Sequence, residues 1–224
     1  MQKLAPGEFK KLASAGHAII DTRKPEVFMD GFIKGAVSIP FTENFLLGLD
    51  ELISGDLNLL IVADVADVVP ALKMLKGAGL ENIAGYLDGG YEAWIEAGNS
   101  FDMIITVDEE EFAIDYQFDE FYLVDLRSRE EFDKEHAEDA ENIALIDVEQ
   151  IILELENDLS YYLYGYEPSD AITAASIFKK HGFQRVRAVN AEYAKIKATN
   201  IPFFAEKKKA KTEGKFPHSD LSEN

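Results

Sequence analysis

Short apolar runs alternate along this chain with stretches whose apolar residues recur at a helical period. The run Leu59–Ala63 is rich in Leu, Ile and Val and is too short for a free-standing helix, which is typical of a strand buried on both faces. The stretch Val68–Leu75 then has a helical period and is ended by Gly77. A second apolar run over 83–87 and a small helix carrying Trp94 follow. This order predicts a βαβ unit, in which ligands bind beyond the carboxyl ends of the strands.

The same pattern occurs a second time further along the chain. Segments 21–28 and 125–132 both place Asp, Arg, Glu and Phe at the same spacing after an apolar run, and they lie 104 positions apart. Ala36 and Ala140 keep this separation, which falls to 102 between the helices that end the two copies. Small insertions and deletions explain the drift. The sequence therefore predicts a duplication of one α/β domain rather than a single large domain.

The boundary between the copies falls where the first copy's last helix runs out, and we place the domains at 1–103 and 104–204. An amphipathic helix over Leu4–Leu12 is predicted to open the first domain. Residues 205–224 are polar, alternate in charge and contain few apolar side chains, so they cannot offset the entropy of ordering by burial. We expect this last segment to be a flexible tail.

Charge narrows the range of partners. The chain carries 42 acidic and 22 basic residues, a net charge of −20, and residues 101–204 contribute −15 of it from 9 basic and 24 acidic residues. Such a surface repels nucleic acids and anionic lipids, so we expect neither a nucleic acid nor a membrane as partner. The acidic segment is either a docking surface for a basic protein or a solvated face, and we favour the latter. With no long apolar run and no export signal, the protein is expected in the cytoplasm.

The chain has no cysteine. Its own residues therefore provide no disulfide, no zinc–thiolate or iron–sulfur ligand, and no thiolate nucleophile.

Several segments resemble rhodanese-like domains. In the first copy they are IIDTRKPEVFMDGFIKGAVSIP (19–40) and GLENIAGYLDGGYEAWIEAG (79–98), and in the second LVDLRSREEFDKEHAEDAENIA (123–144). The resemblance implies two α/β domains, each a five-stranded parallel sheet with helices on both faces. Residues 59–90 are more narrowly similar to the first of two rhodanese repeats that follow a metallo-β-lactamase-fold hydrolase domain in some bacterial proteins. The zinc-binding histidine motif of that hydrolase has no counterpart here.

The resemblance also places the family's active loop after the central strand, where backbone N–H groups stabilise a sulfur anion on a cysteine. Asp64 stands at the cysteine position in the first copy and Gly165 in the second, and neither can accept a sulfur atom. The vestigial loops are then Asp64, Val65, Ala66, Asp67 and Val68 in the first copy, and Gly165, Tyr166, Glu167, Pro168, Ser169 and Asp170 in the second.

Asp64 is the sharpest candidate for chemistry. It could act as an aspartyl nucleophile, or bind Mg²⁺ together with Asp67. The favoured alternative is that Asp64 or Asp67 caps the following helix.

Two interpretations are also open for the second loop. Gly165 leaves an uncharged cradle that could bind an anion, but Glu167 and Asp170 bring two negative charges into the loop. We therefore favour a turn followed by a helix that begins near Pro168 or Ser169.

In each copy, an Asp-x-Arg sequence follows the first predicted strand. Arg23 with Asp21, and Arg127 with Asp125, could contact an anionic ligand. The favoured interpretation is a structural ion pair in each copy.

These observations favour a catalytically inactive tandem rhodanese-like module with a binding, regulatory or scaffolding role towards a protein partner. It could be the C-terminal part or the companion of a metallo-β-lactamase-fold hydrolase. The alternatives are a sulfur-relay protein that uses a partner's cysteine, and a metal or phosphoryl activity centred on Asp64. No cofactor is expected, and the sequence favours no particular oligomeric state.

Overall fold

The computed structural model describes residues 2–52, 58–80 and 82–205. The tail predicted over 205–224 lies outside this range apart from Ala205. The elements of the first domain are β1 (Gln2–Leu4), α1 (Pro6–Ser14), β2 (Ala18–Asp21), α2 (Pro25–Phe28), β3 (Ala36–Ser38), α3 (Phe45–Leu52), β4 (Leu59–Val62), α4 (Val68–Gly77), β5 (Ile83–Leu87) and α5 (Gly90–Glu96).

The second domain repeats this order with additions. Its elements are β6 (Ile105–Val107), α6 (Glu109–Phe118), β7 (Tyr122–Asp125), α7 (Arg129–Lys134), β8 (Glu135–Ala137), β9 (Ala140–Asn142), α8 (Val148–Ile151) between the 3-10 turns Leu145–Asp147 and Ile152–Glu154, β10 (Tyr161–Tyr164), α9 (Pro168–Lys180), β11 (Val186–Val189), α10 (Tyr193–Ala198) and β12 (Phe203–Ala205). Within the described ranges, no helix has both the length and the apolarity required to cross a bilayer.

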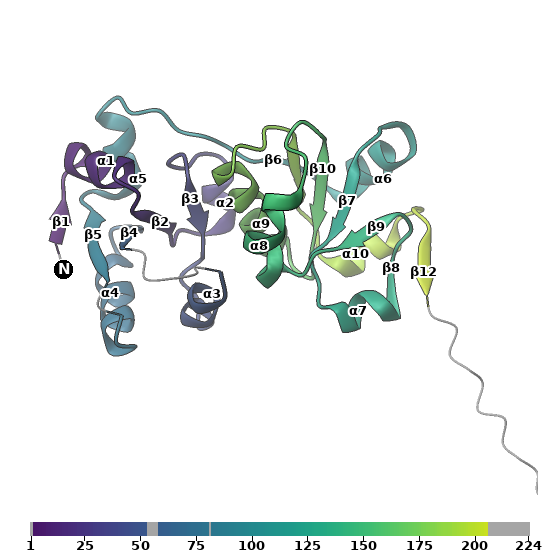
Figure 1. Cartoon of the computed structure of the whole chain (residues 1–224), viewed down its shortest axis with the longest axis horizontal. Helices are drawn as coiled ribbons and strands as arrows, with labels where there is room; N and C mark the ends of the chain where they lie inside the picture. Colours follow the sequence, from purple (N-terminus) through teal and green to yellow (C-terminus); the bar gives the residue numbers. More distant parts are fainter. Residues whose placement is uncertain (1, 53–57, 81, 206–224) are drawn as a thin grey trace, which may run out of the picture.

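Each domain is built on a five-stranded sheet whose neighbouring strands all run parallel. The strand order is β1-β5-β4-β2-β3 in the first domain and β6-β11-β10-β7-β9 in the second. Helices flank the sheets, and the two domains lie side by side along the long axis of the molecule (Figure 1). The predicted fold class is thus confirmed. An antiparallel pair, β8 with β12, was not predicted from the sequence.

The duplication extends to the register of the sheets. Ile19 of β2 pairs with Ala36 of β3, and Leu123 of β7 pairs with Ala140 of β9. Both pairs keep the separation of 104 positions that the sequence shows, so the predicted repeat is confirmed at the level of single residues.

The beginning of the chain differs from the prediction. Leu4 does not start a helix but ends β1, where it pairs with Leu87 of β5 and is 1% exposed. Pro6 occupies the first turn of α1, because its fixed φ and missing N–H suit a helix start. The predicted helix was too long at its beginning, because Leu4, a buried residue of β1, happens to fit the apolar period of the helix that follows.

Helix α9 of the second domain lies between the two sheets (Figure 1). All residues of Ala171–Lys179 are buried, whereas the equivalent helix α4 has exposed positions along its length. Small side chains such as Ala174 and Ala175 allow close packing, and one continuous hydrophobic core contains residues of both domains. The two repeats therefore form one packed body.

Polar side chains of α9 bind the edge strand of the first domain. The Ser38 backbone N–H donates to the Ser176 hydroxyl, and the Thr173 hydroxyl donates to the Ser38 carbonyl, both at 3.0 Å. Lys179 also forms an ion pair of 3.2 Å with Asp102, close to the boundary between the domains. Spacings of three residues place Thr173, Ser176 and Lys179 on one face of α9. This face covers the edge that β3 would otherwise expose.

Candidate functional site

The candidate loops follow the central strands β4 and β10, at the carboxyl ends of the sheets. Val62 at the end of β4 pairs with Asp21, and Tyr164 at the end of β10 pairs with Asp125. Because Asp21 and Asp125 are equivalent in the repeat, Val62 and Tyr164 are equivalent as well.

This register corrects the alignment of the two loops. Counting from the strand ends, Asp64 corresponds to Tyr166, and Gly165 corresponds to Ala63. The two positions chosen from the sequence as equivalent are one residue out of step. Apolar strand residues and short loops offer little sequence detail by which to detect such a slip.

Backbone hydrogen bonds connect the first loop to the beginning of helix α4. The Asp64 carbonyl accepts hydrogen bonds from the backbone N–H groups of Asp67 at 2.9 Å and Val68 at 3.1 Å. Asp67 stands at the cap position, but its carboxylate makes no capping hydrogen bond. Its φ of −95° and ψ of −13° are helical, whereas a capping side chain requires an extended backbone. The expectation that Asp64 or Asp67 caps this helix is therefore wrong for Asp67, and both residues are partly exposed.

Two valines of this loop region face solvent. Val65 is 70% exposed and Val69 is 71% exposed, whereas Val68 between them is buried. The first loop thus presents apolar side chains next to the two carboxylates.

The second loop is filled by its own helix. One carboxylate oxygen of Asp170, Oδ2, accepts hydrogen bonds from the backbone N–H groups of Tyr166 at 3.0 Å and Glu167 at 2.9 Å. A Cβ on Gly165 would lie 2.5 Å from the Cβ of Asp170, so only glycine leaves room for this side chain. The cradle that Gly165 was expected to leave open is therefore occupied by Asp170.

The favoured interpretation of this loop is confirmed. Helix α9 begins at Pro168, whose missing N–H is no loss at the first helical position. Burial raises the pKa of the Asp170 carboxyl, and the two N–H donors offset this only in part.

The ion pair predicted for the first domain is confirmed. Arg23 donates to Asp21 from Nε at 2.9 Å and from Nη2 at 2.6 Å, and both residues are buried. Nη2 also donates to the Gly31 carbonyl at 2.9 Å, and the guanidinium lies 4.1 Å from the ring centre of Tyr91. Complete burial raises the pKa of the Asp21 carboxyl, although Arg23 acts to lower it.

The second domain repeats this network and extends it. Arg127 donates to Asp125 at 3.0 and 2.6 Å and to the Glu135 carbonyl at 2.7 Å, and it lies 3.6 Å from the ring centre of Tyr193. Burial acts to lower the pKa of Arg127, but the hydrogen bond and charge of Asp125 outweigh it and raise that pKa. Burial also raises the pKa of Tyr193 to about 12. The Tyr164 hydroxyl adds a hydrogen bond to Asp125 at 2.7 Å.

Three tyrosines of these networks were missed in the sequence. Tyr91 and Tyr193 are 102 positions apart, the same separation as the terminal helices, so a pairwise comparison of the copies could have found them. Tyr164 has Val62 as its equivalent, and no repeat signal marks it. Both arginines are nearly fully buried, at 2% and 6% exposure, and a contact of either with a ligand stays a prediction.

Comparison with known proteins identifies the repeat unit. The model of the rhodanese-like domain family matches residues 5–97 and again residues 110–199. No curated protein matches the chain.

Among solved structures, the rhodanese-like domain of the Alr3790 protein from Anabaena sp. is 22% identical, covers 55% of this chain and 91% of its own, and has a TM-score of 0.43. The thiosulfate sulfurtransferase from Pseudomonas aeruginosa is 14% identical, with 92% of this chain and 44% of its own covered and a TM-score of 0.42. A protein of unknown function and possible tyrosine phosphatase from Rhodopseudomonas palustris is 13% identical, with 45% and 85% covered and a TM-score of 0.40.

The two matches of the family model span most of the chain, and each falls on one of the parallel sheets described above. The chain belongs to the rhodanese-like domain family and contains two copies of the domain.

Proposed function

We propose that this chain is a tandem rhodanese-like module that does not transfer sulfur and that acts by binding a protein partner. One observation carries the proposal. In the second domain the Asp170 carboxylate already accepts the N–H groups of Tyr166 and Glu167, which a sulfur anion would need. The chain also has no cysteine to bear that sulfur.

The first loop supports binding to a protein. Exposed apolar side chains are common singly, but Val65 in the first loop and Val69 in the first turn of α4 are both exposed where the resemblance places the family's active loop. The neighbouring carboxylates of Asp64 and Asp67 favour a partner that carries basic residues around an apolar patch. A metallo-β-lactamase-fold hydrolase, in the same protein or separate from it, is the partner class that the resemblance of residues 59–90 suggests.

The absence of sulfur transfer is tested by incubating the purified chain with thiosulfate and cyanide. Thiocyanate should not rise above the level formed in buffer, because no thiolate is present to take up the sulfane sulfur. Turnover that remains in proportion to the chain through repeated purification would overturn this part of the proposal.

Binding is tested by calorimetry of the chain against such a hydrolase domain. The double variant Val65→Ser with Val69→Ser should weaken the complex by at least about tenfold, because two apolar contacts are lost. Val27→Ser is a matched control, since Val27 is 47% exposed on α2, outside the loop. Equal affinities of all three proteins would show that the loop is not the contact surface, and no heat with wild type would refute this partner class.

A further inference from the structure

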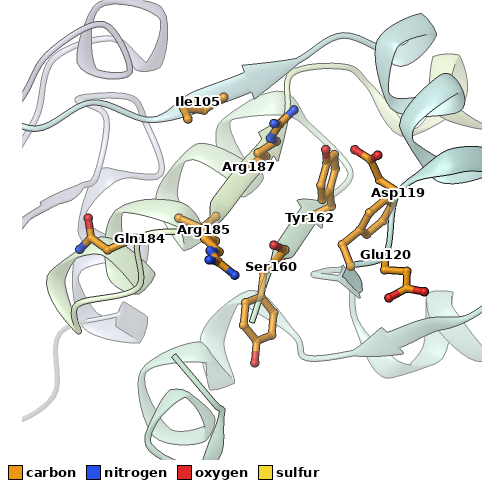
Figure 2. Close-up of a pocket in the computed structure, with 11 residues that line it drawn as sticks. Ile105, Asp119, Glu120, Ser160, Tyr162, Gln184, Arg185 and Arg187 are labelled. Atoms are coloured by element: carbon orange, nitrogen blue, oxygen red, sulfur yellow. The ribbon is translucent and has the colours of Figure 1, made fainter. Parts of the chain in front are cut away.

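Besides the loop after β10, the described part of the second domain contains a pocket that is large enough for a small ligand. A pocket of about 420 Å³ lies where β7, β10 and β11 begin, at the opposite end of the sheet from the candidate loops. This volume is within the usual range for small-molecule sites. Figure 2 shows Arg185 and Arg187 on one side of it and Asp119 and Glu120 on the other, with Tyr162 and Ser160 between them.

The pocket follows a row of residues across the sheet. Ile105 of β6 pairs with Arg187 of β11, and Arg187 pairs with Tyr162 of β10. Paired residues of parallel strands project to the same face. An aliphatic, a cationic and a phenolic side chain therefore lie next to one another on this face.

The first domain does not repeat this row. The equivalent residues are Gln2, Gly85 and Leu60, in the same pairing. A Cβ on Gly85 would lie 2.6 Å from the Gln2 carbonyl oxygen and 2.7 Å from a methyl carbon of Leu4. Leu4 thus takes the space that a side chain at Gly85 would need. The arginine row is a property of the second copy alone.

The arginines of the pocket are incompletely neutralised. Arg187 Nη1 lies 3.4 Å from Asp115 Oδ2, and the Tyr162 hydroxyl donates to that same oxygen at 2.7 Å. Arg185 donates from Nη1 to the Asp158 carbonyl at 3.2 Å and forms no ion pair with a described residue. By contrast, Arg23 forms a buried two-pronged ion pair in the first domain. Arg185 thus has no carboxylate partner among the described residues, and Arg187 has a single long contact with one, so both guanidinium groups are available to an external anion.

The facing wall carries the opposite charge. Asp119 and Glu120 are exposed at the turn between α6 and β7, and neither forms an ion pair with a described residue. Ser160 lies between this wall and the arginines (Figure 2), and the ring of Phe121, which also lines the pocket, stacks on Tyr162. The two carboxylates would repel a polyanion such as a nucleotide, while they would attract an ammonium group.

We propose that this pocket binds a small zwitterion of the α-amino acid type. The guanidinium groups of Arg185 and Arg187 bind its carboxylate, because their planar forks match carboxylate geometry. Asp119 and Glu120 bind its ammonium group, and its apolar side chain packs on Phe121 and Ile105. The site is independent of the proposed partner binding, which uses the first domain.

The probes are the standard α-amino acids, tested one by one by saturation-transfer NMR on the full chain. L-Leucine is compared with 4-methylpentanoate, which lacks the ammonium group, and with 3-methylbutylamine, which lacks the carboxylate. Each analogue should bind at least about tenfold more weakly than leucine, because one set of charge-assisted hydrogen bonds is lost. Equal affinity of either analogue, or no saturation of any amino acid, would overturn the proposal.

Variants localise the site. Arg185→Gln combined with Arg187→Gln should abolish the leucine signal, and Asp119→Asn combined with Glu120→Gln should weaken it by at least about tenfold. Arg129→Gln is the matched control, because Arg129 is exposed on α7 and pairs there with Asp133. Circular dichroism of each variant checks the fold. A leucine signal that persists in the folded arginine variant would place binding elsewhere and refute the assignment.

Discussion

The Ser176 hydroxyl accepts a hydrogen bond of 3.0 Å from the backbone N–H of Ser38, across the contact between the two domains. Ser38 is completely buried, so this N–H has no access to water. The Ser176 side chain of α9 thus accepts the hydrogen bond that a neighbouring strand would accept if the sheet continued beyond β3.

Replacing Ser176 with alanine is predicted to destabilise the whole protein. The Ser38 N–H would be left buried without an acceptor, which costs about 1–3 kcal/mol. The free energy of unfolding, measured by urea denaturation, should fall by this amount. An unchanged midpoint and slope would contradict the assigned role.

Ser38→Ala is the matched comparison at the same contact. The Ser38 hydroxyl oxygen is buried and has no hydrogen-bond partner among the described residues. Alanine removes this hydroxyl and keeps the backbone groups that bind Ser176 and Thr173. We expect stability to be unchanged or to rise by up to about 1 kcal/mol in the same urea titration. A loss as large as that of Ser176→Ala would show that the hydroxyl has a partner after all.

Tyr164→Phe tests the network that is specific to the second domain. The Tyr164 hydroxyl donates to Asp125 and accepts from the Ala137 N–H at 3.2 Å, so its removal leaves two buried groups short of a partner. We predict a loss of about 1–3 kcal/mol in the free energy of unfolding. Tyr166→Phe serves as control, because Tyr166 is 59% exposed and should tolerate the change within about 0.5 kcal/mol. Equal effects of the two variants would contradict the prediction.

Asp170→Asn is predicted to change how stability depends on pH. Both backbone N–H groups bind the same oxygen of Asp170, so an asparagine oxygen can replace it. Burial raises the pKa of this carboxyl above its usual value. Its stabilising contribution is therefore complete in the protonated form, below the usual aspartate range, and is lost as pH rises through the raised pKa.

Thermal unfolding between about pH 3 and pH 7 measures this effect, since the usual aspartate pKa is near 4. The melting temperature of the asparagine variant, relative to wild type, should increase with pH. A difference that stays constant over this range, or that decreases, would refute the assigned pKa direction.

The sequence was sufficient for the fold because the fold depends on many apolar positions at once. Runs such as Leu59–Ala63 and the shared spacing around Asp21 and Asp125 indicated parallel strands, and the register of the sheets agrees with them. The buried Asp–Arg pairs were predictable for the same reason, because each copy supports the interpretation of the other.

The loops were harder to predict because single backbone angles and single contacts decide them. Asp67 has the residue type of a cap but a helical φ and ψ, so its side chain does not reach the first turn. The sequence suggested an open cradle at Gly165, but the side chain of Asp170 folds back into it from the first turn of α9. Residue type alone does not show which of two nearby acidic side chains accepts a hydrogen bond from a backbone N–H group.

The contact between the domains is not reciprocal, because one repeat offers a strand edge and the other offers a helix face. The counterparts of these two surfaces are helix α4 of the first domain and edge strand β9 of the second. The position of Ser176 in α9 corresponds to Lys73 in α4, which is exposed, and Ser38 corresponds to Asn142 of β9, whose side chain turns inward to the Asp125 and Arg127 carbonyls. A lysine replaces the small hydroxyl that a close approach requires. The α4 face therefore lacks the group that accepts the strand N–H in the contact between α9 and β3.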